Sequence, residues 1–293
     1  MRVGGMGSWV VSEKQTLEVH YHWLVEVCMP RIQANGISIY YETGGTGPRM
    51  LFISGTGGDL RNRPNVFDGP LPGSFEVLAY DQRGLGQSGK PATEYSMADY
   101  ADDAAALLDA LGWGEVPVMG VSFGGMVAQE LALRHPARVS ALVLACTSAG
   151  GAGGASYPLH ELESLDTDNR IERHLELADT RRDGSWRAAH PDKWATLMDM
   201  SRGARRHDGD PEGAKRQLAA RAGHETWARL TDLDLPVLLA GGRYDGIAPP
   251  ANMVALADRM RGSELRMFDG GHLFLMQDKK AYPDIIQWLS NQG

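Results

Sequence analysis

The hydrophobic positions of the chain fall into short apolar runs that alternate with segments of helical spacing. A short apolar run bounded by turn residues is typical of a buried strand, whereas apolar positions three and four apart are typical of a helix. We therefore expect an α/β fold whose mostly parallel, twisted sheet carries helices on both faces. The expected strands are residues 50–53, 75–80, 116–121, 139–146, 235–240 and 264–268, and the expected helices are 97–111, a segment from 123 to near 135, 251–260 and 282–290.

The segment 32–42 consists of two strand-like runs on either side of Asn35-Gly36. Asn and Gly both tolerate the positive φ angles that a two-residue hairpin turn requires. We therefore expect an antiparallel hairpin here, ahead of the parallel strands.

One long segment interrupts the alternation of strands and helices. After a Gly-, Ala- and Ser-rich stretch at 148–156, the sequence is helical and polar until about Asp234. We interpret residues 151–234 as a helical cap that is inserted into an α/β core of residues 29–150 and 235–293.

Residues 1–28 differ from the rest of the chain in their pattern of polar and apolar residues. They mix charged with apolar residues and contain no continuous hydrophobic region of the kind found in a signal peptide. We interpret them as an N-terminal extension, or the product of an upstream start codon, ahead of a domain that begins near Met29. The alternative is an ordered strand or helix that docks on the core.

Composition and charge exclude several classes of function. The chain has 293 residues, of which 43% are hydrophobic and 23% charged, so it can bury a large core. A formal net charge of −8 argues against a nucleic-acid surface or a polybasic membrane anchor, and no apolar run is long enough to cross a bilayer. Cys28 and Cys146 are too few for a disulfide framework, so we expect reduced thiols in a cytoplasmic protein. We expect a monomer or homodimer that acts on a small-molecule substrate.

The most informative motif is Gly120-Val121-Ser122-Phe123-Gly124, which joins an expected strand to an expected helix. Gly-x-Ser-x-Gly in this context is the nucleophile elbow, a sharp turn that lifts the serine hydroxyl clear of the backbone. The helix N-terminus there favours developing negative charge. Ser122 is therefore the candidate nucleophile. The alternative is an ordinary Gly/Ser turn between a strand and a helix.

A serine nucleophile needs a base, and the base needs an acid that fixes its tautomer. Asp245 follows the strand expected at 235–240, and His272 follows the last expected strand. Ligand sites of parallel sheets lie at the carboxyl ends of the strands, and the order Ser, Asp, His is the one found in this fold. Asp245 could instead cap the following turn, and His272 could cap a helix. Asp269 is the rival acid, but it lies too near His272 in sequence to orient that ring easily.

The oxyanion formed by serine attack needs two hydrogen-bond donors. The N–H of Phe123, directly after the candidate nucleophile, is one donor by position. We expect the other to be the N–H of Thr56, in the glycine-rich loop 54–58 that follows an expected strand. The alternative for that loop is a flexible glycine turn.

The histidines of the cap lack the spacing of metal ligands, and of these we keep His224 as a possible pocket residue. We expect no metal and no organic cofactor. Aromatic and methionine side chains of the cap could wall an apolar pocket, although such residues are more often ordinary packing. These are Trp186, Trp194, Met198, Met200 and Trp227.

From Ile32 to the C-terminus the chain resembles the α/β-hydrolase superfamily, especially the small bacterial serine hydrolases of the enol-lactonase and carboxylesterase groups. The resemblance implies that the loop 81–88 is architectural. Many relatives have His-Gly in the oxyanion loop where this chain has Ser54-Gly55, so the hydrogen bonds that brace the loop must differ. A serine at the elbow argues against the epoxide-hydrolase and haloalkane-dehalogenase branches. The motifs that carry the resemblance are Asp81-x-Arg83-Gly84-x-Gly86-x-Ser88, the elbow around Ser122, Asp245 with Pro249, and Gly271-His272.

These observations predict a serine hydrolase that cleaves a carboxylic ester or a lactone of a small apolar substrate through an acyl-enzyme on Ser122. The same three residues would also serve C–C bond hydrolysis, acyl transfer or perhydrolysis. A hydrolase-fold receptor or binding protein with slow turnover is the alternative from another class.

Overall fold

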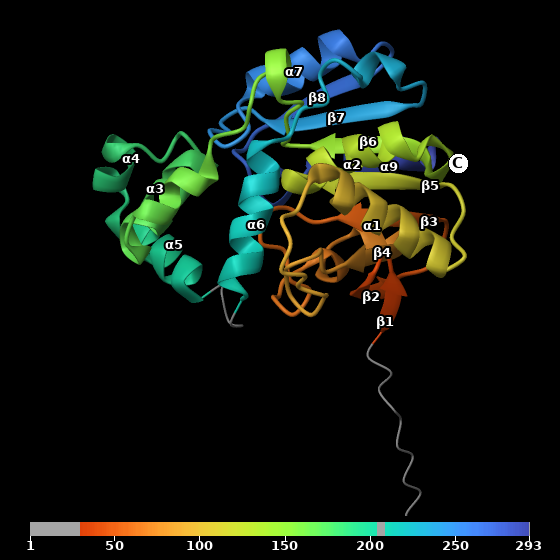
Figure 1. The fold of residues 1–293 in the computed structure, drawn as a ribbon. Coiled ribbons are helices and arrows are strands. Elements are labelled where there is room, and N and C mark those ends of the chain that lie inside the picture. The colour runs from red at the N-terminus through yellow and green to blue at the C-terminus, as the bar shows by residue number, and fades with distance from the viewer. Residues whose placement is uncertain (1–29, 204–208, 293) are drawn as a thin grey trace, which may run out of the picture.

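The computed structural model describes residues 30–203 and 209–292, so the predicted extension at 1–28 lies outside the described residues. The described chain forms one eight-stranded sheet in the order β1-β2-β4-β3-β5-β6-β7-β8 (Figure 1). The pairs β1/β2 and β2/β4 are antiparallel and all other neighbours are parallel. The mostly parallel sheet expected from the sequence is therefore confirmed. Its strands are β1 (Arg31–Ala34), β2 (Ile37–Gly44), β3 (Arg49–Ile53), β4 (Glu76–Tyr80), β5 (Val116–Val121), β6 (Val139–Ala145), β7 (Val237–Gly242) and β8 (Glu264–Phe268).

Helices cover both faces of the sheet, as predicted. Side chains of α1, α2 and α7 pack in one hydrophobic cluster, and those of α8 and α9 pack in the other. Successive strand residues contribute to opposite clusters, since side chains alternate across a strand; Val118 belongs to the first cluster and Met119 to the second. The helices are α1 (Met97–Ala110), α2 (Phe123–Arg134), α3 (Thr167–Ala178), α4 (Gly184–Ala189), α5 (Pro191–Gly203), α6 (Pro211–Ala222), α7 (Pro250–Arg259), α8 (Phe274–Gln277) and α9 (Ala281–Ser290).

The predicted hairpin is formed by β1 and β2. Asn35 and Gly36 have φ angles of 47° and 76°, which are the left-handed values that their residue types were expected to supply. The Asn35 side chain also donates to Asp103 of α1 at 2.8 Å, so the turn is tied to the helix behind it.

The chain between β6 and β7 is helical and contributes no strand in its described part. Figure 1 shows α3, α4 and α5 standing away from the sheet, with α6 between them and the core. A small apolar cluster holds this region together and includes Ile247 from the loop after β7. The helices expected at 151–234 are therefore placed beside the carboxyl ends of the strands, where α/β proteins bind their ligands.

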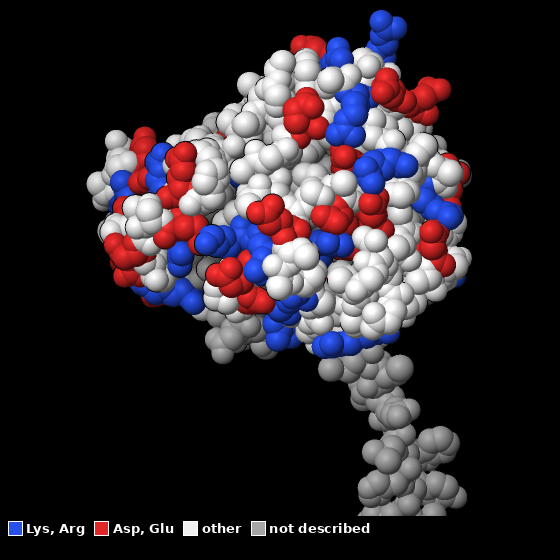
Figure 2. Space-filling view, viewed as in Figure 1, with Lys and Arg blue, Asp and Glu red and all other residues white. Residues whose placement is uncertain are grey.

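Acidic and basic side chains are interspersed on the face drawn in Figure 2. Many of them pair at the surface, for example Asp109 with Arg138. In residues 30–203 and 209–292, no helix is both long and apolar enough to cross a bilayer.

Arg83 and Asp103 form a buried ion pair between the loop after β4 and helix α1. Their side chains are 6% and 1% exposed, and two hydrogen bonds of 2.7 and 2.6 Å join the guanidinium to the carboxylate. The paired geometry offsets the cost of removing both charges from water. Arg83 thereby fixes the loop that the sequence identified as architectural.

Replacing Asp103 by Ala leaves the Arg83 charge buried without its main partner. We expect the free energy of unfolding to fall by about 3–5 kcal/mol, measured by urea denaturation. Asp109→Ala removes the carboxylate of an exposed pair on the same helix and is expected to cost less than about 1 kcal/mol. Equal losses of unfolding free energy in the two variants would show that the buried Arg83–Asp103 pair matters no more for stability than an exposed pair.

Candidate active site

Ser122 lies at a strained turn between β5 and α2. Its φ and ψ angles are 56° and −116°, and its side chain is largely buried. A Cβ on Gly120 would lie 2.2 Å from the carbonyl oxygen of Gly124, and one on Gly124 would lie 2.0 Å from that of Ile53. Both glycines are therefore required by close backbone contacts, as the elbow motif predicts.

The structure brings together Ser122, Asp245 and His272, which lie on three separate loops at one edge of the sheet. His272 Nε2 is 3.0 Å from Ser122 Oγ, and His272 Nδ1 is 2.7 Å from Asp245 Oδ2. Both distances are those of hydrogen bonds. The arrangement can move the serine proton to the imidazole while the carboxylate holds the ring.

Asp245 both caps its turn and contacts the histidine. Its Oδ1 accepts hydrogen bonds from the N–H groups of Ile247 and Ala248, each at 2.8 Å, and its Oδ2 faces His272. The two roles weighed for this residue are therefore compatible, because each uses a different oxygen. The rival Asp269 has a side chain that is 71% exposed and pairs with Arg181 at 3.1 Å.

The surroundings of His272 shift its proton affinity. Burial disfavours the charged imidazolium, but the neighbouring Cys146 sulfur and the Asp245 carboxylate outweigh burial and raise the pKa of His272. Polar atoms of these three residues lie within 4.8 Å of one another, a spacing that a metal ion could bridge. Both imidazole nitrogens are already hydrogen-bonded, so a metal would have to displace Ser122 or Asp245.

The loop expected to complete the oxyanion hole lies against Ser122. A Cβ on Gly55 would be 3.4 Å from that of Ser122. The N–H of Phe123 is the first amide of α2, where helix geometry supplies no internal acceptor. Thr56 follows Gly55 in the loop, and its hydroxyl is buried without a partner among the described residues.

Two glutamines brace this loop. Their hydrogen bonds are the ones that hold the loop in this chain, where Ser54 stands in the place of the histidine of many relatives. Gln82 Nε2 donates to the carbonyl oxygen of Ser54 at 2.7 Å. Gln217 of α6 accepts from the N–H of Gly57 at 2.9 Å. Neither contact could be predicted from the sequence, since the two residues lie 28 and 160 positions away from the groups they bind.

The end of α3 is inserted between the loops that carry Asp245 and His272. The carbonyl oxygen of Leu177 accepts from Gly246 N at 2.8 Å, and that of Ala178 accepts from His272 N at 2.7 Å. The end of α3 thus contacts the loops that carry Asp245 and His272 through two consecutive residues.

A side-chain link reinforces this junction. Asp179 is 2% exposed and accepts from Gln277 Nε2 at 2.9 Å, and Gln277 Oε1 accepts from the N–H of Gly271 at 2.7 Å. Arg181 binds the same carboxylate through two further hydrogen bonds. Because Gly271 precedes His272, the link fixes the backbone that presents the imidazole. Nothing in the sequence pattern marked Asp179 or Gln277.

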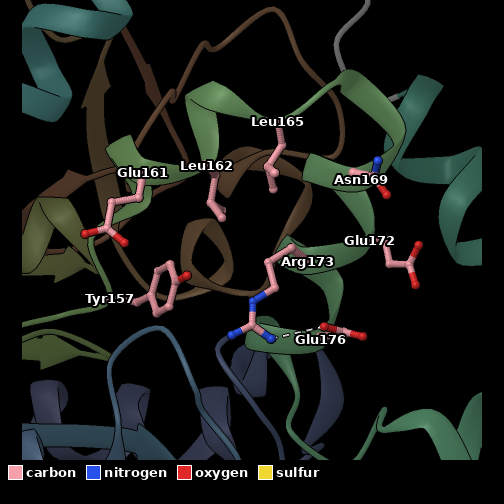
Figure 3. Close-up of a pocket in the computed structure, with 8 residues that line it drawn as sticks. All are labelled: Tyr157, Glu161, Leu162, Leu165, Asn169, Glu172, Arg173 and Glu176. Atoms are coloured by element: carbon pink, nitrogen blue, oxygen red, sulfur yellow. Dashed lines mark hydrogen bonds and ion pairs between the residues drawn. The ribbon is translucent and has the colours of Figure 1, made fainter.

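Two cavities lie in and beside the cap. The larger, of about 420 Å³, is lined by Tyr157, Leu162, Leu165, Arg173 and neighbouring residues, and Figure 3 shows Arg173 beside Glu176, with which it pairs. It contains none of the three predicted catalytic residues.

The smaller cavity, of about 120 Å³, lies between α2, the segment after β6 and the end of α6. His224 lines it, so the prediction that this histidine is a pocket residue is confirmed. The aromatic wall expected from the cap is not found at either cavity. Trp186 instead stacks on His190, and Met200 is 66% exposed. None of the five cap residues proposed for that wall lines the two cavities described here.

The comparisons with known proteins agree with this geometry. Residues 48–279 match the family model described as "alpha/beta hydrolase fold". The chain belongs to the α/β-hydrolase family. It is an α/β-hydrolase enzyme, and the resemblance noted from its motifs is confirmed.

Relatives within this family differ in their named activities. The chain is 32% identical to the poly(3-hydroxyalkanoate) depolymerase of Ectopseudomonas oleovorans, over 81% of this chain and 82% of that protein. It is 31% identical to the 2-hydroxymuconate semialdehyde hydrolase of Pseudomonas sp. strain CF600, over 87% and 91% of the two chains. Among solved structures, a thermophilic esterase from Thermogutta terrifontis matches with a TM-score of 0.69 and 25% identity, over 89% and 98% of the two chains. The relatives are thus hydrolases with different substrates.

Replacing Gln277 by Ala breaks both hydrogen bonds that join Asp179 to Gly271. Because a small displacement of a reacting group is costly, we expect kcat to fall by about tenfold to a hundredfold with little change in KM. Hydrolysis of a short p-nitrophenyl ester measures this. Gln33→Ala, at an exposed position of β1, is the matched control. Unchanged kcat in Gln277→Ala would mean that the link does not position His272.

Proposed function

We propose that this α/β-hydrolase cleaves a carboxylic ester or a lactone of a small apolar substrate through an acyl-enzyme on Ser122. The observation that carries the proposal is the hydrogen-bonded series Ser122 Oγ, His272 Nε2, His272 Nδ1 and Asp245 Oδ2. Ser122 sits on an elbow with the positive φ angle that a nucleophile position requires. No metal or organic cofactor is needed for this chemistry.

In the first half of the reaction, Ser122 Oγ attacks the substrate carbonyl while His272 Nε2 takes its proton. The Asp245 carboxylate stabilises the imidazolium. The resulting oxyanion lies where the amides of Phe123 and Thr56 would donate to it. When the C–O bond to the leaving oxygen breaks, that oxygen takes the proton from His272 and the acyl group stays on Ser122.

In the second half, His272 takes a proton from water, whose oxygen attacks the acyl carbon. The ester bond to Ser122 breaks, Ser122 regains its proton, and the carboxylic acid leaves. With a lactone, the leaving hydroxyl remains attached to the acyl chain, and the product is a hydroxy acid.

C–C bond hydrolysis is the second candidate, favoured by the relative named 2-hydroxymuconate semialdehyde hydrolase. Because the triad suits both reactions equally, the preference for ester cleavage rests on the relatives named as a depolymerase and as an esterase. Comparing kcat/KM for p-nitrophenyl butyrate with that for a vinylogous 1,5-diketone discriminates between them. A larger value for the diketone would assign the chain to the second candidate. Acyl transfer and perhydrolysis would appear as acceleration by an added alcohol or by peroxide.

Replacing Ser122 by Ala removes the proposed nucleophile. We expect kcat for p-nitrophenyl butyrate to fall on the order of 10⁶-fold, as for other serine hydrolases that lose this group. If the variant and the unmodified protein released nitrophenol equally, Ser122 would not be the nucleophile. Negligible turnover by the unmodified protein, with tight binding of the ester, would instead favour a receptor.

Replacing Asp245 by Asn keeps the shape of the side chain but favours the wrong imidazole tautomer. The expected loss in kcat is about 10⁴-fold. Asp269→Asn is the matched control because that carboxylate is exposed and pairs with Arg181, and its kcat is expected to stay within about twofold. A reversed ranking of the two variants would transfer the acid's role to Asp269.

The pH dependence follows from the state that His272 must have. The base accepts a proton only when it is neutral, so kcat/KM rises as pH rises through its pKa. Because the surroundings raise the pKa of His272, the midpoint of this rise is expected above 6.5. A kcat/KM profile measured from pH 5 to 10 tests this. A midpoint at or below 6.5 would contradict the electrostatics described for the site.

A further inference from the structure

The smaller cavity presents an arginine whose charge has no acidic partner. Arg221, at the end of α6, lines the cavity and is 6% exposed. Its Nη1 donates to the carbonyl oxygen of Tyr157 at 2.8 Å, which fixes the guanidinium plane. Its Nε and Nη2 are buried and have no hydrogen-bond partner among the described residues.

Nε and Nη2 form one edge of the Arg221 guanidinium. Other arginines of this chain bind carboxylates through the same edge. Nε and Nη2 point the same way and form a fork that matches the two oxygens of a carboxylate. In the described structure this edge binds an Asp side chain in Arg61–Asp59, Arg83–Asp103, Arg134–Asp102 and Arg181–Asp179. In Arg221 the same edge has no hydrogen-bond partner among the described residues.

The electrostatics of the cavity favour an anion. Burial lowers the pKa of Arg221 to about 10, so the side chain remains charged at neutral pH. None of the described residues that line the cavity is acidic. An uncompensated buried charge is costly, and a purely structural role would be filled better by an apolar side chain.

The other polar groups of the cavity are also arranged for a ligand. His224 Nε2 lies 3.1 Å from the carbonyl oxygen of Ser148 and donates to it, which leaves Nδ1 as a free acceptor. Burial lowers the pKa of His224 to about 4, so the ring is neutral at physiological pH. The hydroxyls of Ser148 and Ser156 lie 3.0 Å apart, and one donates a hydrogen bond to the other. Arg221 is therefore the only arginine or lysine of the described lining, and no residue of that lining supplies a counter-charge.

We propose that this cavity is a binding site for a small carboxylate, which the Nε and Nη2 atoms of Arg221 hold through two parallel hydrogen bonds. The cavity has a volume of only about 120 Å³, so the ligand is a short-chain acid. Met126, which lines the cavity, lies in the first turn of α2, the helix that begins directly after Ser122. The carboxylate therefore belongs either to the far end of a substrate or to a separate small acid.

Binding of butyrate to the full chain tests the proposal without any need for catalysis. We would titrate the protein with ¹³C-labelled butyrate at constant ionic strength and measure Kd by ligand-observed NMR, with butyramide as the neutral compound of the same shape. Saturable binding of butyrate, at least tenfold tighter than that of butyramide, is the expected result. Equal binding of the two compounds, or no saturable binding of butyrate, overturns the proposal.

Arg221→Gln removes the fork and is expected to weaken butyrate binding at least tenfold. Arg216→Gln is the matched control, because it removes one positive charge from the same helix at a residue that does not line the cavity. Butyrate binding that survives in Arg221→Gln, or that is lost equally in both variants, contradicts the site. If Arg221→Gln does not fold, Ala155→Leu, at another residue of the lining, fills the cavity and is expected to abolish binding.

The source of the carboxylate follows from the effect of added butyrate on the hydrolysis of p-nitrophenyl butyrate, measured as changes in KM and kcat for the ester. A rise in KM with unchanged kcat, abolished by Arg221→Gln, assigns the carboxylate to the substrate. A change in kcat alone, or no change, assigns the site to a separate acid. Both kinetic results are compatible with a carboxylate site. Whether the site exists is decided by the titration with butyrate, which does not require the ester to be a substrate.

Discussion

The backbone turn at Ser122 is the constraint on which the rest of the structure depends. A positive φ at a non-glycine residue costs about 1–3 kcal/mol, and here packed backbone on both sides maintains it. Gly120 and Gly124 allow β3, β5 and α2 to approach so closely that no side chain fits between them. The same turn places the serine hydroxyl beyond the sheet edge, at the first turn of α2. The position of the proposed nucleophile thus depends on the close backbone packing around Gly120 and Gly124.

The loops that complete the site are held by the cap as well as by the sheet. Leu177 and Ala178 bind the loops of Asp245 and His272, and Gln217 binds the loop of Thr56. The inserted helical segment therefore contacts every loop to which the sequence assigns a role, apart from the elbow itself. Movement of α3 or α6 would therefore displace the backbone of the loops that carry Asp245, His272 and Thr56.

The sequence predicts the features that follow from local pattern. The apolar runs located the parallel strands, the Asn35-Gly36 pair located the hairpin, and turn residues after β5, β7 and β8 pointed to the three residues that the structure brings together. The contacts of Gln277, Gln217 and Arg221 could not be predicted, because each joins segments far apart in the chain and none belongs to a repeating motif. The packing of the cap was missed for the same reason: amphipathic spacing identifies its helices but does not specify which face meets the core, and Met200 is exposed.

Covalent labelling tests the central claim most directly. A p-nitrophenyl alkylphosphonate transfers its phosphonyl group to an activated serine and releases one nitrophenolate, giving a stable mimic of the tetrahedral intermediate. Peptide mass spectrometry of the labelled protein is expected to find the group on Ser122, with labelling at least about a thousandfold slower after His272→Ala. Labelling of another residue, or equal rates with and without the imidazole, would contradict the account.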